Sequence, residues 1–311
     1  MKPYRESRFR YPTEAAVFLE EWNQQIERLN GFSYERLNLP TSFGTTRVWA
    51  ANEHLHSAPT VVFFPGARTC GLFWDLDNAL QPFRKHYRYY IVDVNGQPSL
   101  SEGGCPRVKT DDYGHWATEV LDGLGIQKTA IAGASLGGLI CLKLCLTSPE
   151  RIEKAVLLNP AGIQPFSTSL HNLYNNLLSI LWPTPANLDR FLNSAVFCPP
   201  HHTLPPAYRK LVCSYLLYIL KNHRFRGDYP APLSKTEFHR LTTDIELIVG
   251  ENDLLFPPRE TIRLAEKNIP SLQSSLVLPK TAHGIETSKV AIMALWESME
   301  SIKRASYEYV C

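Results

Sequence analysis

The stretch that decides the fold is TAIAGASLGGL, residues 129–139. It begins as an apolar run typical of a buried strand, and an apolar, helix-like run continues from it to residue 146. Between them Ser135 stands in a Gly-x-Ser-x-Gly pattern, flanked by Gly133 and Gly137. Glycine lets the strand and helix backbones approach closely. The pattern predicts a sharp strand–turn–helix that exposes the Ser135 hydroxyl at the positive end of a helix.

Outward from this stretch, strand-like and helix-like segments alternate along most of the chain. A helix is expected at 12–30 and a hairpin at 32–52, followed by strands at 60–64, 89–94, 128–132, 154–158, 244–249 and 275–278. Helices are expected between or after them, at 71–86, 111–124, 135–146 and 288–305. Near-continuous apolar strands alternating with helices predict an α/β fold, with a mostly parallel central sheet covered by helices on both faces.

One long stretch interrupts this alternation. Residues 163–240 carry helical patterns at 170–182 and 207–222, are rich in proline and contain no clear strand. The stretch falls between two core strands, so it is predicted to be a helical cap inserted over the carboxyl edge of the sheet, where open α/β sheets bind ligands. The predicted domains are therefore a core of residues 1–162 and 241–311 with a cap insertion at 163–240.

Composition excludes several classes of function. The chain has 311 residues, 44% of them hydrophobic, and a net charge of only +2, which gives no reason to expect nucleic-acid binding. Its charged start lacks the apolar run of a signal peptide, and no stretch approaches the ~20 apolar residues of a membrane span. The seven cysteines show no zinc-binding spacing. We expect a cytoplasmic protein without a bound metal, as a monomer or homodimer.

A nucleophilic serine needs a base to take its proton and an acid to orient that base. In proteins with a serine on such a turn, the acid and then the histidine follow it along the chain. His283 is the predicted base, because it lies in a loop just past the last expected strand. Asp253, past the preceding strand, is the predicted acid, with Glu251 in reserve. Asp228 ranks third, because an insertion is a poor place to hold a rigid triad.

Acyl transfer also needs two backbone N–H donors for the oxyanion. The residue after the nucleophile, Leu136, is predicted to supply one of them. The turn after the strand at 60–64 is predicted to supply the other, because Gly66 permits the turn and the N–H of Ala67 would then point inward.

Three nearby side chains are candidates for a substrate pocket. Arg68 could contact a substrate carboxylate or simply face solvent. Phe73 and Trp74 could pack the helix expected after the turn or touch the acyl group.

With these motifs in place, the chain resembles the α/β-hydrolase superfamily over almost its whole length, and within it bacterial carboxylesterases of the type known from Bacillus. The resemblance is carried by seven segments: 41–48, 64–74, 110–116, 124–128, 133–139, 250–253 and 282–284. The predicted cap resembles the family only loosely. Pro65, where many enzymes of this fold carry histidine, is the main departure near the chemistry.

The resemblance implies the α/β-hydrolase fold and a serine hydrolase that cleaves small-molecule carboxylic esters through an acyl-enzyme. It assigns Ser135 as nucleophile, Asp253 as acid and His283 as base, with Ala67 and Leu136 as oxyanion donors and no cofactor. Other chemistries of the same fold stay open: carbon–carbon bond hydrolysis, cofactor-free peroxidation and acyl transfer. A ligand sensor that retains the triad without turnover is the alternative from outside enzymology.

Overall fold

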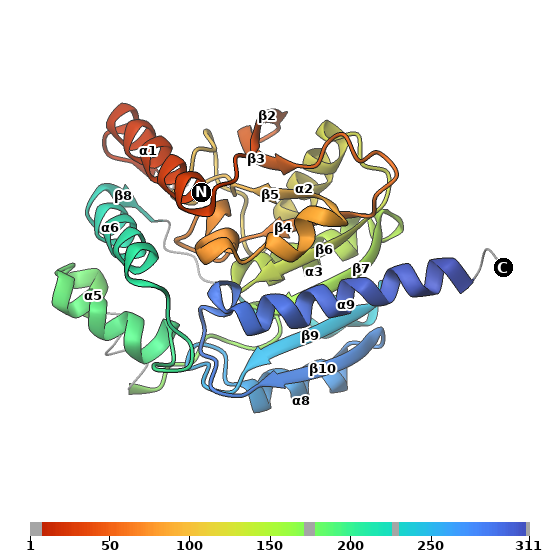
Figure 1. Cartoon of the computed structure of the whole chain (residues 1–311). Helices are drawn as coiled ribbons and strands as arrows, with labels where there is room; N and C mark the ends of the chain where they lie inside the picture. Colours follow the sequence, from red (N-terminus) through yellow and green to blue (C-terminus); the bar gives the residue numbers. More distant parts are fainter. Residues whose placement is uncertain (1–7, 171–177, 226–229, 309–311) are drawn as a thin grey trace, which may run out of the picture.

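The computed structural model describes residues 8–170, 178–225 and 230–308, so most of the helix expected at 170–182 lies outside the described residues. An eight-stranded sheet forms the centre of the molecule (Figure 1). β3 runs opposite to the other seven strands of this sheet, so the prediction of a mostly parallel sheet is confirmed. From one edge to the other the order is β10 (Leu272–Leu278), β9 (Ile245–Gly250), β7 (Ile152–Leu158), β6 (Thr129–Ala134), β4 (Thr60–Phe64), β5 (Arg88–Val92), β3 (Gly44–Ala51) and β2 (Glu35–Thr41).

The central strands are apolar along their whole length because helices cover both faces of the sheet. Every residue of β4 and β6 is buried. Successive side chains of a strand point to opposite faces. Val61 and Phe63 thus belong to one hydrophobic cluster, with α1 (Pro12–Asn30) and α9 (Lys289–Glu308). The intervening side chains of β4 join a second cluster on the other face, which contains residues of α2 (Asp112–Gly123), α3 (Leu136–Thr147) and α8 (Pro258–Asn268).

The single helix predicted for 71–86 is wrong. The segment forms two 3-10 helices, η1 (Gly71–Asn78) and η2 (Gln81–Lys85). Asp75 explains the break, because its buried carboxylate accepts a hydrogen bond from the backbone N–H of Leu80 (2.9 Å) and so competes with regular helix bonding. Two residues next to the break, Asp77 and Asn78, adopt left-handed φ values of 58° and 59°.

The segment between β7 and β9 is mainly helical, but it is not free of strands. Its described helices are α5 (Pro185–Phe191), the π-helical turn η4 (Leu192–Val196), α6 (Pro206–Asn222) and α7 (Lys235–His239). A two-residue strand, β8 (His223–Arg224), pairs antiparallel with β1 (Arg8–Phe9) at the start of the chain. This pair was not predicted, because two-residue strands carry no periodic signal.

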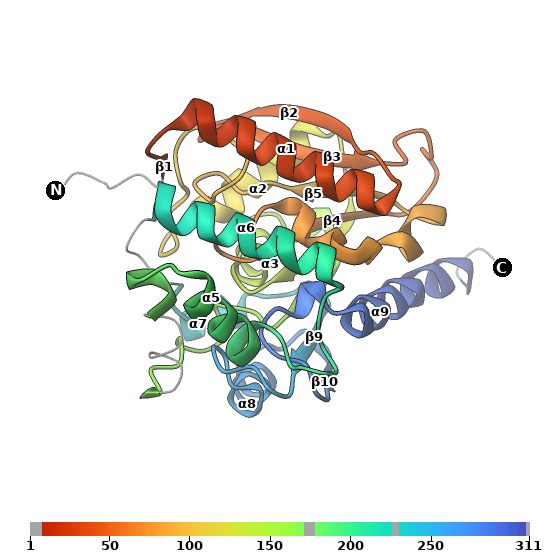
Figure 2. The same ribbon diagram turned by 60° about the vertical axis from the view of Figure 1, so that its left-hand side comes forward.

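The N-terminal helix joins this segment to the rest of the molecule. Figure 2 shows α1 and α6 lying side by side. Trp22 of α1 donates its indole N–H to the carbonyl of Leu211 (2.8 Å), and Tyr208 of α6 donates to the Asn30 side chain (2.7 Å). Helix α1 therefore packs on the inserted helix α6 as well as on the hydrophobic core beside the sheet.

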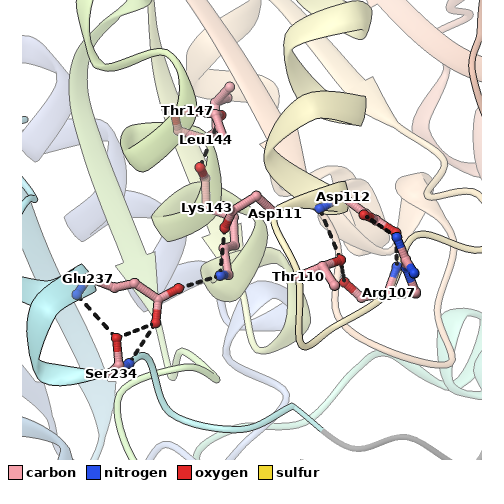
Figure 3. A network of polar contacts seen from close by, with 9 residues as sticks. All are labelled: Arg107, Thr110, Asp111, Asp112, Lys143, Leu144, Thr147, Ser234 and Glu237. Atoms are coloured by element: carbon pink, nitrogen blue, oxygen red, sulfur yellow. Dashed lines mark hydrogen bonds and ion pairs between the residues drawn. The ribbon is translucent and has the colours of Figure 1, made fainter.

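A buried lysine makes a second connection, shown in Figure 3. The ammonium of Lys143, on α3, donates to Glu237 of α7 (2.6 Å) and to Asp111 (2.9 Å), and its side chain is only 5% exposed. Partial burial acts to raise the pKa of Glu237, but hydrogen bonds from Lys143 and Ser234 outweigh it and lower that pKa to about 2. The ion pair ties α7 to the helix that follows Ser135.

Across the described ranges, no helix combines the length and apolar character needed to cross a membrane.

Candidate active site

Ser135 occupies the tight turn between β6 and α3 that the sequence predicts. Its φ is 51°, a left-handed value that is unfavourable for a residue with a side chain and is typical of functional sites. The flanking positions must be glycine, because a Cβ atom at either of them would overlap the backbone of a neighbouring element. A Cβ on Gly133 would lie 2.2 Å from the carbonyl oxygen of Gly137, and a Cβ on Gly137 would lie 1.9 Å from that of Phe64. Only glycine permits these contacts. The contacts keep β6 and α3 close together, and this close approach holds Ser135 in its strained conformation.

The structure brings the predicted acid and base together with Ser135. His283 follows β10 and has a side chain 12% exposed, whereas the side chain of Asp253 is fully buried. The imidazole Nδ1–H donates to Asp253 Oδ2 (2.9 Å). Because a carboxylate only accepts, the other ring nitrogen, Nε2, is left to accept the Ser135 hydroxyl proton (3.0 Å). The arrangement is that of a base held between an acid and a nucleophile.

The second oxygen of Asp253 fixes the acid in place. Oδ1 accepts the backbone N–H groups of Leu255 (2.7 Å) and Phe256 (3.1 Å). Glu251 instead is exposed and accepts the backbone N–H of Lys280 (3.0 Å), so it is a turn carboxylate. Asp228 lies outside the described residues.

Electrostatics favour the charged form of the histidine. Burial alone would lower the pKa of His283, but the Asp253 carboxylate, through its charge and its hydrogen bond, outweighs burial and raises that pKa above its ordinary value. A second carboxyl group, Glu286, acts in the same direction. The ring is therefore a stronger base than a free imidazole, which suits proton abstraction from a serine.

The predicted oxyanion turn passes directly beside Ser135. A Cβ on Gly66 would lie 3.5 Å from the Cβ of Ser135. Within the part of the chain that the structure describes, neither the N–H of Ala67 nor that of Leu136 donates a hydrogen bond to another residue. The neighbouring N–H, of Arg68, is already bonded to the side chain of Gln97 (2.9 Å). Ala67 and Leu136 are thus available as donors, and their role stays a prediction.

The three candidate pocket residues have different surroundings. Phe73 is 4% exposed and stacks on Trp22 with ring centroids 5.3 Å apart, and Trp74 is fully buried. Both belong to the hydrophobic core. Arg68 is half-buried, and its guanidinium lies 5.3 Å from the ring centroid of Phe225. A role of any of the three in substrate binding stays a prediction.

Sequence reasoning missed Asn159, which follows β7 at the carboxyl edge of the sheet. Its side-chain N–H group donates to the carbonyls of Ala282 (3.0 Å) and His283 (3.2 Å). Its side-chain oxygen accepts the backbone N–H of Gly250 (2.7 Å). One buried amide thus links the loop of the base to the turn that leads to the acid. A polar residue directly after a buried strand at this edge was the available signal.

The segment between β7 and β9 also forms hydrogen bonds with the loop that contains His283. The backbone N–H of His283 donates to the carbonyl of Ala195 (3.1 Å), and the next N–H donates to Val196 (3.0 Å), both at the end of η4. His202 contacts the hydroxyl of Thr287 through Nε2 (3.0 Å). The two residues of each pair lie about 80–90 positions apart in the chain, which is why no local pattern predicted these contacts.

The described residues hold no group of three or more His, Cys, Asp or Glu side chains that could bind a metal ion.

The chain is similar to known proteins of the alpha/beta hydrolase fold. The family model described as the alpha/beta hydrolase fold matches residues 59–195. The uncharacterized carboxylesterase nap of Bacillus subtilis strain 168 is 27% identical over 243 residues, which cover 77% of each chain. The carboxylesterase YbfK of the same organism is 21% identical over 84% of this chain and 85% of its own.

A solved structure matches over almost the whole chain. The crystal structure of naproxen esterase (carboxylesterase NP) from Bacillus subtilis superposes with a TM-score of 0.79, covering 93% of this chain and 98% of its own at 23% identity. The resemblance to bacterial carboxylesterases that the sequence indicates is confirmed.

Proposed function

Because this chain has the alpha/beta hydrolase fold, we propose that it is a serine carboxylesterase that cleaves small-molecule esters through an acyl-enzyme intermediate. The observation that carries the proposal is the continuous hydrogen-bond path from Ser135 Oγ through His283 to Asp253, at 3.0 and 2.9 Å. The similarity to two Bacillus carboxylesterases supports the choice of an ester as substrate.

In the acylation step, Ser135 Oγ attacks the ester carbonyl carbon while its proton passes to Nε2 of His283. The negative charge that develops on the carbonyl oxygen is stabilised by the N–H groups of Ala67 and Leu136. Asp253 stabilises the imidazolium and keeps its orientation. The imidazolium then protonates the leaving alcohol as the carbon–oxygen bond of the ester breaks, which leaves an acyl group on Ser135.

In the deacylation step, His283 takes a proton from water, and the resulting hydroxide equivalent attacks the acyl carbon. Collapse of the second tetrahedral intermediate releases the carboxylic acid and returns the proton to Ser135. No step requires a group beyond these side chains, the backbone and water.

We also propose that residues 163–240 act as a cap on a core formed by 1–162 and 241–311, and that the substrate enters between them. Support comes from the hydrogen bonds that the carbonyls of Ala195 and Val196 accept from the loop of His283. A cytoplasmic location is proposed because Cys70, Cys141, Cys145, Cys198 and Cys213 are free thiols. Cell fractionation tests that location.

Steady-state turnover of p-nitrophenyl butyrate tests the function. We expect many turnovers per chain, and we expect Ser135→Ala to abolish them while the circular dichroism spectrum is unchanged. A fluorophosphonate should label the wild-type protein and leave Ser135→Ala unlabelled. A single burst of one p-nitrophenol per chain, without further turnover, would contradict the esterase proposal and favour a ligand sensor.

A further inference from the structure

A second buried carboxyl group lies beside the triad, and the mechanism above does not use it. Glu286 is 6% exposed and stands in the 3-10 turn η5 (Ile285–Thr287). Ile285 N–H donates to the carbonyl of His283 (2.7 Å), which tightens the chain directly after the base. Glu286 follows His283 by three residues, and the charge of its carboxylate acts on the His283 ring.

The carboxyl group of Glu286 reaches the oxyanion turn. A Cβ built on Gly66 would lie 3.3 Å from Glu286 Oε1 and 3.5 Å from the Cβ of Ser135. The Glu286 carboxyl group and Ser135 thus lie next to the same point of the oxyanion turn. A methyl group at this position would press on the glutamate oxygen.

Within the described ranges, no lysine or arginine forms an ion pair with this carboxyl group. Among the described residues, the one hydrogen bond that favours its charged form comes from its own backbone N–H. The charges of η1 are paired elsewhere: Asp75 with Arg84 (2.6 Å), and Asp77 with Lys289 of α9 (2.7 Å). The charged groups that act on Glu286 are His283 and Asp253.

The positive charge of protonated His283 is therefore the charge that can stabilise the Glu286 carboxylate. Burial raises the pKa of Glu286, and the positive form of His283 acts to lower it. The interaction is mutual, because the same carboxylate raises the pKa of His283. Such a pair titrates together, and each charged form stabilises the other.

We propose that Glu286 is a second carboxylate of the catalytic centre, a positioning residue that stabilises the imidazolium formed when His283 takes the proton of Ser135. The inference rests on the proposed esterase function. Asp253 fixes the ring through Nδ1, whereas Glu286 acts on its charge without a direct hydrogen bond. Glu286 also lies near the oxyanion turn, where its negative charge opposes the developing oxyanion. Its main effect is thus on the pH at which the base works, and its effect on the maximal rate is smaller.

The pH dependence of kcat/KM for Glu286→Gln tests this role, because glutamine keeps the size of the side chain and removes its charge. We expect the midpoint of the acid limb to fall by about one pH unit, and the plateau rate to stay within about tenfold of wild type. Glu286→Asp keeps the charge and should shift the midpoint less. Glu251→Gln, on the neighbouring turn, is the matched control and should not shift it. An unchanged midpoint in Glu286→Gln would overturn the proposal.

Two measurements separate this inference from the proposed function. The NMR titration of the His283 ring in wild type and Glu286→Gln needs no turnover, so it tests Glu286 even if no ester is hydrolysed. Equal ring midpoints would overturn the inference alone. If Glu286→Gln does not fold, the role of Glu286 is tested in the wild-type protein, by following the NMR chemical shift of its carboxyl carbon as a function of pH. We expect Glu286 to ionise before His283 loses its proton, and a carboxyl group that stays protonated beyond that point would exclude the proposed role.

Discussion

At the scale of single residues, the candidate site combines a serine in a strained conformation with a histidine that bonds to a buried aspartate. Sequence spacing predicted Ser135, Asp253 and His283, because an elbow motif and two strand-end loops are local patterns. It did not predict Asn159 or Glu286. Their importance comes from the loops that they contact, and those loops meet only in the folded chain.

Replacing the acid should remove the orientation of the base. We expect Asp253→Asn to lower kcat about 10⁴-fold, because an amide can donate to Nδ1 and thereby stabilise the wrong tautomer of His283. Stopped-flow measurement of acylation by p-nitrophenyl butyrate checks this loss. Glu251→Gln is the control and should retain the wild-type rate. If the glutamine variant lost activity and the asparagine variant did not, the acid would be misassigned.

Replacing Asn159 should loosen both catalytic loops together. Asn159→Ala leaves the N–H of Gly250 and the carbonyls of Ala282 and His283 without their partner, so we expect about 1–3 kcal/mol less stability. We also expect a lower kcat, because the base is held less firmly. Urea unfolding and steady-state kinetics measure the two effects. Asn38, which is exposed on the edge strand β2, serves as control, and equal results for Asn38→Ala and Asn159→Ala would refute the linking role.

At the scale of elements, the inserted helices are held by contacts with three distant parts of the chain. η4 contacts the loop that contains His283, α6 contacts α1, and α7 contacts Lys143 of α3. The hydrophobic pattern identified most strands and helices because it reports burial directly. It failed at 71–86, where the carboxylate of Asp75 competes with helix bonding, and at β8, whose partner is more than 200 residues away.

The ion pair between α3 and α7 should make stability depend on pH in a defined window. The pKa of Glu237 falls from 4.5 to about 2 on folding, so its contribution is complete above about pH 4.5 and is lost as the pH falls toward 2. We expect Glu237→Gln to lower Tm at pH 7 and the difference from wild type to close toward pH 2. Thermal unfolding at a series of pH values measures it.

The exposed pair of Glu260 and Arg263 on α8 provides the matched control, because exposed pairs contribute little. Glu260→Gln should leave Tm almost unchanged at every pH. A Tm difference for Glu237→Gln that does not vary between pH 7 and pH 3 would contradict the account.

At the scale of the whole molecule, Ser135, Asp253 and His283 meet at one edge of the sheet because β6, β9 and β10, which precede them in the chain, run parallel and end there. That arrangement follows from strand order, so the sequence pattern was enough to predict it. What covers this edge was not predictable in detail. It depends on long-range pairings such as Trp22 with Leu211, for which a single sequence carries no signal.

The central claim is that Ser135 carries the acyl group during turnover. Rapid acid quench of the protein with p-nitrophenyl butyrate, followed by mass spectrometry of intact protein and peptides, tests it most directly. The account predicts a butyryl adduct on the peptide that contains Ser135, which forms with p-nitrophenol release, decays as butyrate appears and is absent from Ser135→Ala. Turnover without an adduct on Ser135, or at an equal rate in Ser135→Ala, would contradict it.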